Sequence, residues 1–302
     1  MTKELSVNIA GVIMKNPVTT ASGTFGSGRE FSEFIDLNKL GAITVKGVSD
    51  VAWKGNNTPR IAETYGGMLN SIGLQNAGVD YFMENDIPFL RQYNTKIIVN
   101  VCGHTIEEYC KTVERLSNAD IDLLELNISC PNVSEGGITF GTNVKMVQKV
   151  VSQVKKYAKQ PLIVKLTPNV TDITEIAKAA VYGGADALSL INTLQGMKID
   201  IYKRKPVLAN KIGGFSGPAI KPIAVRMVYQ VAKAVDVPII GMGGISNGED
   251  AIEFIMAGAT AVAIGTANFS NPIATVETIE GIQQYMEQYH IKDINDIRGI
   301  ID

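Results

Sequence analysis

The chain of 302 residues is 45% hydrophobic and 19% charged, a composition typical of a globular protein with a sizeable core. Its 28 basic and 30 acidic residues give a formal net charge of −2, so we expect neither nucleic acid nor a membrane surface as a partner. Its apolar runs have the length of strands and fall short of the roughly 20 residues that a membrane span needs.

The cysteines and the N-terminal residues indicate where the protein works. Cys102, Cys110 and Cys130 are widely spaced and form no CxxC pair, so we expect no metal site in this chain. The N-terminal residues show no signal-peptide pattern. The spacing and odd number of the cysteines indicate reduced thiols, which are typical of the cytosol, so we expect a cytoplasmic protein.

A short hairpin is expected first, since two apolar segments, 5–9 and 12–15, flank the turn-forming pair Ala10-Gly11. Beyond it, short apolar runs alternate with longer segments of helical periodicity. The predicted strands are 18–21, 42–45, 96–101, 122–126, 162–166, 187–191, 238–241 and 261–264.

A helix is predicted after each of these strands. The predicted helices are 29–37, 79–93, 106–117, 144–158, 173–182, 220–234, 248–257 and 273–289. Eight such units indicate an α/β fold, a (β/α)8 TIM barrel with an N-terminal β-hairpin, forming a single domain over residues 1–302. The competing fold is a doubly wound open sheet, but the glycines at 22–28 do not have the GxGxxG spacing typical of that fold.

Two connections between a strand and its helix are long, from residue 46 to about 77 and from 192 to about 217. Active sites of such barrels are built from the loops that follow the carboxyl ends of the strands. We therefore expect these two long βα loops to lie over the active site.

Polar residues stand at the ends of the first six strands. They are Ser22, Lys46, Asn100, Asn127, Lys165 and the pair Asn192-Thr193. Amide groups both donate and accept hydrogen bonds, which suits a ring that carries N–H and C=O groups. Because buried lysines without anions are unfavourable, the two lysines predict anionic ligands.

Glycines follow the last two strands, in Gly241-Met242-Gly243-Gly244 and Gly265-Thr266. Loops at these two places commonly hold a phosphate in barrels, because glycine lets backbone N–H groups approach the oxygens and a nearby helix N-terminus adds partial positive charge. The pattern predicts a phosphate site but does not distinguish flavin mononucleotide from a sugar phosphate or pyridoxal phosphate.

Cys130 comes just after the fourth strand, before a glycine-bearing loop over residues 134–141. An isolated cysteine is usually a small buried hydrophobe. Here its polar neighbours favour a chemical role, and the two histidines, His104 and His290, are expected to be structural or solvated. The thiol is therefore the candidate for proton transfer, and nearby positive charge would lower its pKa.

In these residues the chain resembles class 1 dihydroorotate dehydrogenases, FMN-containing barrels of pyrimidine biosynthesis, over essentially its whole length. The matching motifs are Asn-Ile-Ser-Cys-Pro-Asn at 127–132, Asn-Ser-Ile-Gly-Leu at 70–74, Val-Lys-Leu-Thr-Pro at 164–168 and the glycine segment 241–266. The loop 134–141 is similar to that of the NAD-linked class 1B form, whereas the fumarate-linked class 1A loop typically contains more proline.

The resemblance implies the oxidation of (S)-dihydroorotate to orotate, with Cys130 as the base for the C5 proton and N5 of FMN as acceptor of the C6 hydride. It implies a substrate site made of Lys46, Asn70, Ser71, Ile72, Gly73, Leu74, Asn127, Asn192 and Thr193. It implies an FMN site made of Ser22, Lys46, Gly47, Asn100, Asn127, Lys165, Ile191, Gly217, Gly243, Gly244, Gly265 and Thr266.

The class 1B resemblance also implies a partner, an electron-transfer subunit that carries FAD and a 2Fe–2S cluster and passes electrons to NAD+. Two catalytic chains, forming a homodimeric core, and two partner chains would make a heterotetramer. Three alternatives stay open: the fumarate-using class 1A homodimer, another FMN barrel such as a tRNA-dihydrouridine synthase, and a non-catalytic phosphate-binding barrel. The near-neutral charge counts against the tRNA enzyme. The quinone-using class 2 is not expected, because the sequence shows no hydrophobic N-terminal extension.

Overall fold

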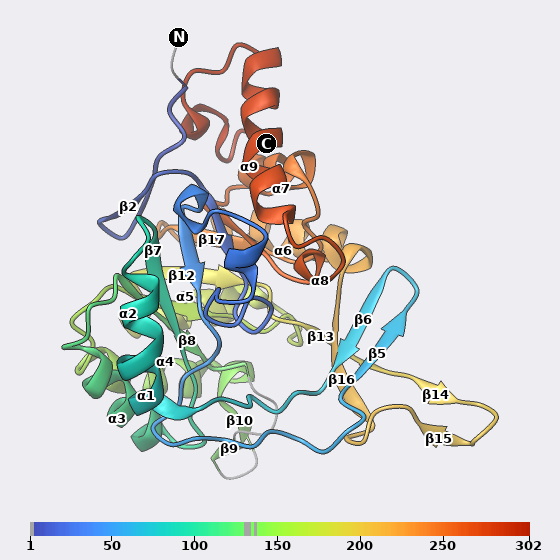
Figure 1. The fold of residues 1–302 in the computed structure, drawn as a ribbon. Coiled ribbons are helices and arrows are strands. Elements are labelled where there is room, and N and C mark those ends of the chain that lie inside the picture. Colours follow the sequence, from blue (N-terminus) through green and yellow to red (C-terminus); the bar gives the residue numbers. More distant parts are fainter. Residues whose placement is uncertain (1–2, 130–133, 136–137) are drawn as a thin grey trace.

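The computed structural model describes residues 3–129, 134–135 and 138–302, and a parallel sheet of eight strands forms its centre (Figure 1). The strands pair in the order β3-β18-β17-β12-β11-β8-β7-β4. Their bounds are β3 (Val18–Thr20), β4 (Ala42–Thr44), β7 (Lys96–Val101), β8 (Leu123–Asn127), β11 (Leu162–Lys165), β12 (Ala187–Leu190), β17 (Ile239–Met242) and β18 (Ala261–Ile264). All eight predicted strands are confirmed, each within one residue at either end.

Threonine side chains join the two ends of this sheet, β3 and β4. The hydroxyl of Thr20 donates to the carbonyl of Thr44 at 3.2 Å and accepts from the Thr44 N–H at 3.0 Å. Beside it, Thr19 Oγ1 and Thr44 Oγ1 lie 3.1 Å apart, and the Gly41 N–H donates to the Val18 carbonyl at 3.1 Å. These contacts bring the two end strands together, and the expected (β/α)8 barrel is confirmed.

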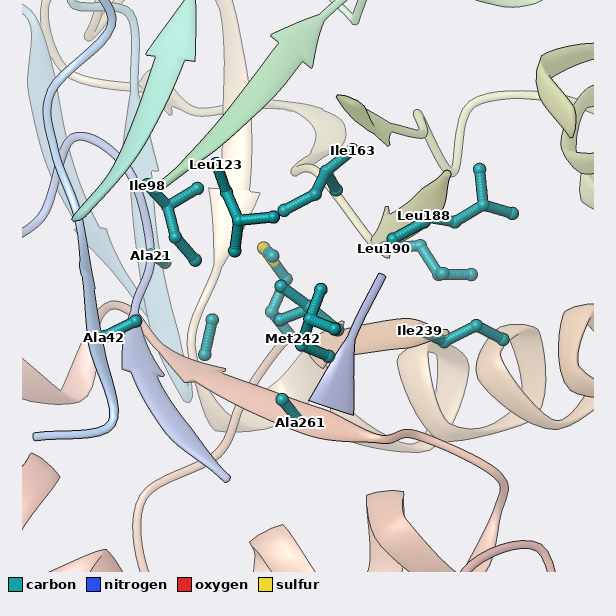
Figure 2. Close-up of a cluster of buried hydrophobic side chains, with 14 of the residues drawn as sticks. Ala21, Ala42, Ile98, Leu123, Ile163, Leu188, Leu190, Ile239, Met242 and Ala261 are labelled. Atoms are coloured by element: carbon teal, nitrogen blue, oxygen red, sulfur yellow. The ribbon is translucent and has the colours of Figure 1, made fainter. Parts of the chain in front are cut away.

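The core consists of apolar side chains from the barrel strands and the helices around them. Figure 2 shows a cluster of these side chains, among them Ile98 from β7, Leu123 from β8 and Ile163 from β11. The strands are largely apolar because parallel strands in such barrels are covered on both faces. The surrounding helices are α3 (Ile106–Leu116), α4 (Val144–Lys155), α5 (Ile173–Tyr182), α6 (Lys221–Ala232), α7 (Gly248–Met256), α8 (Ala267–Ser270) and α9 (Ala274–Gln288).

These helices begin at polar caps and bury one face. The side chain of Asn143 accepts from the Met146 N–H and starts α4, and Thr105 and Asn247 cap α3 and α7 in the same way. Along α4, Val147, Val150, Val151 and Val154 are buried, a spacing of three and four residues that places them on one face. The predicted helices over 106–117, 144–158, 173–182, 220–234, 248–257 and 273–289 are confirmed.

The predicted helix over 29–37 is wrong. The segment forms two short 3₁₀ turns, η1 (Phe31–Glu33) and η2 (Leu37–Lys39), separated by Asp36 in an extended conformation. The Asp36 carboxylate accepts from the Asn38 N–H, which starts a new turn instead of continuing a helix. In addition, Phe31 stacks on Phe25, with ring centroids 4.0 Å apart, and this contact holds the first turn against the preceding loop.

The predicted helix over 79–93 is present but irregular. It consists of α1 (Gly78–Tyr81), a π-helical stretch η3 (Phe82–Asp86) and α2 (Ile87–Leu90). Pro88 stands at the start of α2 and has no N–H for the helical ladder. The π-helical turns therefore lie where Pro88 would interrupt the regular series of α-helical hydrogen bonds.

The N-terminal hairpin is confirmed as β1 (Val7–Ile9) and β2 (Val12–Met14). Val7, Ile9 and Met14 are buried within the main core, and the hairpin leads directly into β3. It therefore lies near the end of the barrel at which the strands begin. The remaining short elements are β9 (Ser134–Glu135), β10 (Ile138–Thr139), η4 (Phe140–Thr142), η5 (Pro218–Ile220) and η6 (Ile294–Ile297).

The two long connections fold together into a second sheet, which the sequence did not predict. Its antiparallel order is β13 (Leu194–Met197), β16 (Ile212–Ser216), β6 (Gly67–Asn70) and β5 (Ile61–Thr64). Between β13 and β16, β14 (Ile199–Asp200) and β15 (Lys205–Pro206) form a separate two-stranded hairpin. We call residues 61–70 and 194–216 the arm, which projects beside the barrel (Figure 1). Gly214 pairs with Asn70 in its register, so the arm joins segments far apart in the chain.

Candidate active site

A large cavity lies where the barrel strands end. Its walls include Ser22 after β3, Lys46 after β4, Asn127 at the end of β8 and Lys165 at the end of β11. The arm and residues 71–75 form the opposite wall. The cavity measures about 1750 Å³, and most small-molecule sites enclose roughly 300–1,000 Å³. It has room for a cofactor and a substrate together.

The structure gathers the predicted substrate residues around this cavity. The residues that line it are Lys46, Asn70, Ser71, Ile72, Gly73, Leu74, Asn127, Asn192 and Thr193. Asn70 comes from the arm and Asn127 from the barrel, so the two sheets meet at this cavity.

The predicted FMN residues also line the cavity, with one exception. The residues in contact with it are Ser22, Lys46, Gly47, Asn127, Lys165, Ile191, Gly217, Gly243, Gly244, Gly265 and Thr266. Asn100 is instead fully buried behind Gly47, where a Cβ added to the glycine would lie 3.0 Å from Asn100 Oδ1. Cys130 lies outside the described residues, but its chain neighbour Ser129 lines the cavity, as does Gly141 at the end of the following loop.

Hydrogen bonds fix the amides that face the cavity. Asn127 Oδ1 accepts from the Ser129 N–H at 3.3 Å and from Asn192 Nδ2 at 3.4 Å. The buried hydroxyl of Tyr109 donates to the Asn127 carbonyl at 2.7 Å and so anchors the end of β8. Asn192 Oδ1 in turn accepts from the Thr193 N–H at 2.8 Å. Amides from two different strands are thereby held in one fixed arrangement.

The segment 70–76, which we call the strap, lines the cavity through residues 70–75 and is held at both ends by hydrogen bonds. Asn56 Nδ2 donates to the Ser71 carbonyl at 3.1 Å and to its hydroxyl at 3.2 Å. At the other end, Asn76 Oδ1 accepts from Ser49 Oγ at 2.9 Å. Trp53 bridges to Asn76 through the backbone and stacks on His104, with ring centroids 3.9 Å apart. The strap therefore rests on the loop that follows β4.

The glycines after β17 leave backbone exposed at the cavity wall. Gly243 and Gly244 have φ values of 131° and 80°, a backbone conformation that residues with a side chain rarely adopt. A Cβ on Gly244 would lie 2.9 Å from the Gly217 carbonyl, and one on Gly243 would lie 2.7 Å from Ala224 Cβ. Across this surface, Thr266 Oγ1 donates to Ser216 Oγ of the arm at 2.8 Å. Backbone N–H groups in such a glycine-rich wall are suited to bind phosphate oxygens.

The two cavity lysines have different electrostatic surroundings. Lys165 Nζ lies 3.7 Å from Glu125 Oε1, and both side chains are buried. Lys46 forms no ion pair with a carboxylate in the part of the chain that the structure describes. Burial lowers the pKa of the Lys46 ammonium; Cys102 opposes this, while Lys165 and Arg60 lower the pKa further. An anionic ligand would relieve this unfavourable burial of charge.

Two polar residues of this region were missed by the sequence analysis. Asn169 donates from Nδ2 to the Thr193 carbonyl at 3.0 Å and accepts from the Gln195 N–H at 2.9 Å. The sequence could have indicated Asn169, because it stands four residues after Lys165, in the loop that follows a predicted strand. Glu125 was also missed, although a charged residue between Leu124 and Leu126 in an apolar strand indicates a buried polar contact.

Comparisons with known proteins agree with this geometry. Residues 4–286 match the family model described as dihydroorotate dehydrogenase. A curated relative from Alkaliphilus metalliredigens (strain QYMF) is 73% identical over 300 residues, covering 99% of each chain, and one from Alkaliphilus oremlandii (strain OhILAs) is 70% identical over 297 residues, covering 98% of each. A third, from Thermoanaerobacter sp. (strain X514), is 57% identical over 295 residues and covers 98% of each. All three are named dihydroorotate dehydrogenase B (NAD(+)), catalytic subunit.

A solved structure shows the same fold. The crystal structure of DHODH from Eimeria tenella in complex with ferulenol superposes with a TM-score of 0.81 at 24% identity, covering 98% of this chain and 88% of that one. Within the described residues, no helix is both long and apolar enough to cross a membrane. The resemblance to NAD-linked class 1B catalytic subunits is confirmed by the curated relatives, and the chain belongs to the dihydroorotate dehydrogenase family.

Proposed function

We propose that this chain oxidises (S)-dihydroorotate to orotate in pyrimidine biosynthesis, as the catalytic subunit of an NAD-linked class 1B enzyme of the cytoplasm. In this proposal residues 1–302 form one FMN-binding domain. The observation that carries the proposal is the lining of a single cavity in a chain that is 73% identical to a B-form catalytic subunit. This cavity is lined by both lysines, by the hydrogen-bonded amides of Asn127 and Asn192, and by the glycines that follow β17 and β18.

The residues present fit FMN. The phosphate would lie against the backbone of Gly243, Gly244 and Gly265, which all line the cavity. Gly243 and Gly244 have positive φ values and pack so closely on Ala224 and Gly217 that neither position has room for a side chain. The ring would lie near Lys165 and Asn127, which offer a cation and an amide to its polar edge. When bound, FMN supplies the acceptor for the hydride that leaves C6 of the substrate.

The protein side of the reaction requires binding, orientation and one proton transfer. The Lys46 ammonium would pair with the substrate carboxylate, since a buried cation without a carboxylate partner favours an anion. Asn127, Asn192 and Thr193 would hold the ring, because their mutual hydrogen bonds already fix their orientation. We assign the base for the C5 proton to Cys130, which the sequence places directly after the cavity residue Ser129.

An electron-transfer subunit that carries FAD and a 2Fe–2S cluster would complete the enzyme and reduce NAD+. We propose a heterotetramer of two such subunits with two catalytic chains, built on a homodimeric core. The support is the name "catalytic subunit" of relatives that span the same length as this chain. The same names favour NAD over fumarate as the final acceptor.

The test uses the purified full chain and, separately, its complex from the native source. The chain should carry the visible absorbance of FMN and lose it when dihydroorotate is added without oxygen. The complex should contain FAD and iron–sulfur signals and reduce NAD+. A colourless chain that no flavin can load would contradict the FMN site, and rapid turnover of the isolated chain with fumarate would contradict the NAD-linked form.

A further inference from the structure

Glu125 lies at the centre of a polar layer inside the barrel, beneath the cavity. Its side chain is 1% exposed, and it comes from the middle of β8. Asn100 Nδ2 donates to Glu125 Oε1 at 2.6 Å, and Ser189 Oγ donates to Oε2 at 2.7 Å. Lys165 Nζ lies 3.7 Å from Oε1. Four barrel strands, β7, β8, β11 and β12, therefore each contribute one member of this layer.

The first consequence concerns the orientation of the Asn100 amide. The contacts of Glu125 are all with donor groups, so its carboxylate acts as an acceptor on both oxygens. The amide nitrogen of Asn100 must face Glu125, and its oxygen must point the other way, toward Gly47. That oxygen is buried and has no hydrogen-bond partner among the described residues. Glu125 thus fixes an unpartnered acceptor beside a glycine of the cavity wall.

The second consequence concerns charge. The Glu125 carboxylate neutralises Lys165 at the cavity floor, whereas Lys46 has no such carboxylate among the described residues. The cavity therefore presents two ammonium groups of which only one is compensated from within the protein. A reduced flavin ring carries more negative charge than an oxidised one, so uncompensated positive charge nearby favours reduction.

We propose that Glu125 is a positioning residue of the flavin site, acting through Asn100 and Lys165 without touching the ligands itself. It holds the Asn100 oxygen against Gly47 of the cavity wall, and it limits how strongly Lys165 favours the reduced flavin. This inference rests on the proposed function, because it requires FMN in the cavity. It extends that function by assigning control of the flavin's reduction potential to a residue buried below the site.

Two substitutions separate the two roles. Glu125→Gln keeps the size and removes the charge, so Lys165 becomes uncompensated and the flavin should become easier to reduce. We expect a tenfold shift of the reduction equilibrium toward the reduced form, which corresponds to about 30 mV for a two-electron couple. Glu125→Asp keeps the charge but shortens the side chain, so Asn100 should lose its fixed orientation. We expect FMN to bind severalfold more weakly and the potential to stay close to that of the wild type.

The matched control is Glu175→Gln, the same chemical change on the exposed face of α5. For each full-length chain, the midpoint potential is measured by dye equilibration, the FMN dissociation constant by fluorescence quenching, and the melting temperature without FMN. A merely structural Glu125 would lower the melting temperature while leaving the potential and the FMN affinity at the control values, and that pattern would overturn the inference.

The outcomes distinguish this inference from the proposed function. If the wild type binds FMN and is reduced by dihydroorotate while Glu125→Gln has the potential of Glu175→Gln, the function stands and the inference fails. If Glu125→Gln does not fold, Glu125→Asp decides, because unchanged FMN affinity in that variant contradicts the positioning role. If the wild type binds no FMN, the proposed function and this inference fall together.

Discussion

Thr193 occupies the space that a side chain at Gly214 would need. Its hydroxyl oxygen overlaps the position of a Cβ built on Gly214. Thr193 follows β12 of the barrel, and Gly214 belongs to β16 of the arm. The arm therefore packs its backbone directly on a residue that we assign to the substrate, and a glycine is what permits this approach.

Replacing this glycine should impair the substrate site. In Gly214→Ala the new methyl group would displace Thr193, so we expect kcat/KM for dihydroorotate to fall about tenfold, or ~1.4 kcal/mol. Gly196→Ala, in β13 of the same arm, is the control, because its Cβ would meet two side chains of the arm itself, the end of Leu69 at 2.9 Å and Phe215 Cβ at 3.5 Å. Steady-state kinetics of the two variants check this. Equal losses in both would indicate a general disturbance of the arm instead.

Replacing Cys130 should slow the proton transfer and spare the cofactor. We expect Cys130→Ser to bind FMN as the wild type does, but its reduction by dihydroorotate at neutral pH should be ~10²–10⁴-fold slower. Partial recovery is expected as the pH rises, because a hydroxyl loses its proton far less readily than a thiol. Stopped-flow measurement of flavin reduction provides the rates.

The control is Cys110→Ser, which replaces a half-buried thiol on α3 whose pKa is raised by burial. Wild-type rates in Cys130→Ser would remove this thiol from the role of base.

Lys46 should make the stability of the cofactor-free chain depend on pH. Burial lowers the pKa of its ammonium in the folded protein, so between that pKa and the ordinary lysine value the unfolded chain binds more protons. The free energy of unfolding should therefore rise with pH across this window. Lys46→Met should be more stable than the wild type at neutral pH, and this gain should fade as the pH approaches the ordinary lysine value.

Urea denaturation of the cofactor-free chains at a series of pH values tests this dependence. The control is Lys292→Met, which removes an exposed ammonium outside the cavity. If the stability difference between Lys46→Met and the wild type is the same at all pH values, the buried charge is not the cause.

The threonines between β3 and β4 should matter for stability more than for activity. Thr20→Val removes two hydrogen bonds and leaves the backbone N–H and carbonyl of Thr44 without those partners. We expect a loss of ~2–6 kcal/mol in the free energy of unfolding, since two buried groups lose a partner and each costs about 1–3 kcal/mol. Thr278→Val is the control, because that buried hydroxyl donates only to the Ala274 carbonyl within α9. Similar losses from both variants in urea denaturation would argue against a special role for the β3–β4 contact.

Local pattern was sufficient for the barrel and for most of the cavity wall. Most barrel strands are short, largely apolar runs, and several of them end in a side chain that lines the cavity, as at Lys46, Asn127 and Lys165. Parallel strands in a barrel all end on the same side, so residues at successive strand ends must come together once the fold is known. For this reason the position of a residue in the sequence predicted its place in the site.

The arm, the Glu125 layer and the burial of Asn100 depend on contacts that no local pattern contains. Strands β6 and β16 pair although they are far apart in the chain, Glu125 meets partners from three other strands, and Asn100 is covered because Gly47 lies next to it. The segment 29–37 failed for a more local reason, since the Asp36 carboxylate starts a new turn at Asn38 and Phe31 stacks on Phe25. Sequence determines which side chains stand at strand ends, because strand periodicity is local. Which of them are neutralised, covered or free to bind is decided only when distant strands pack together.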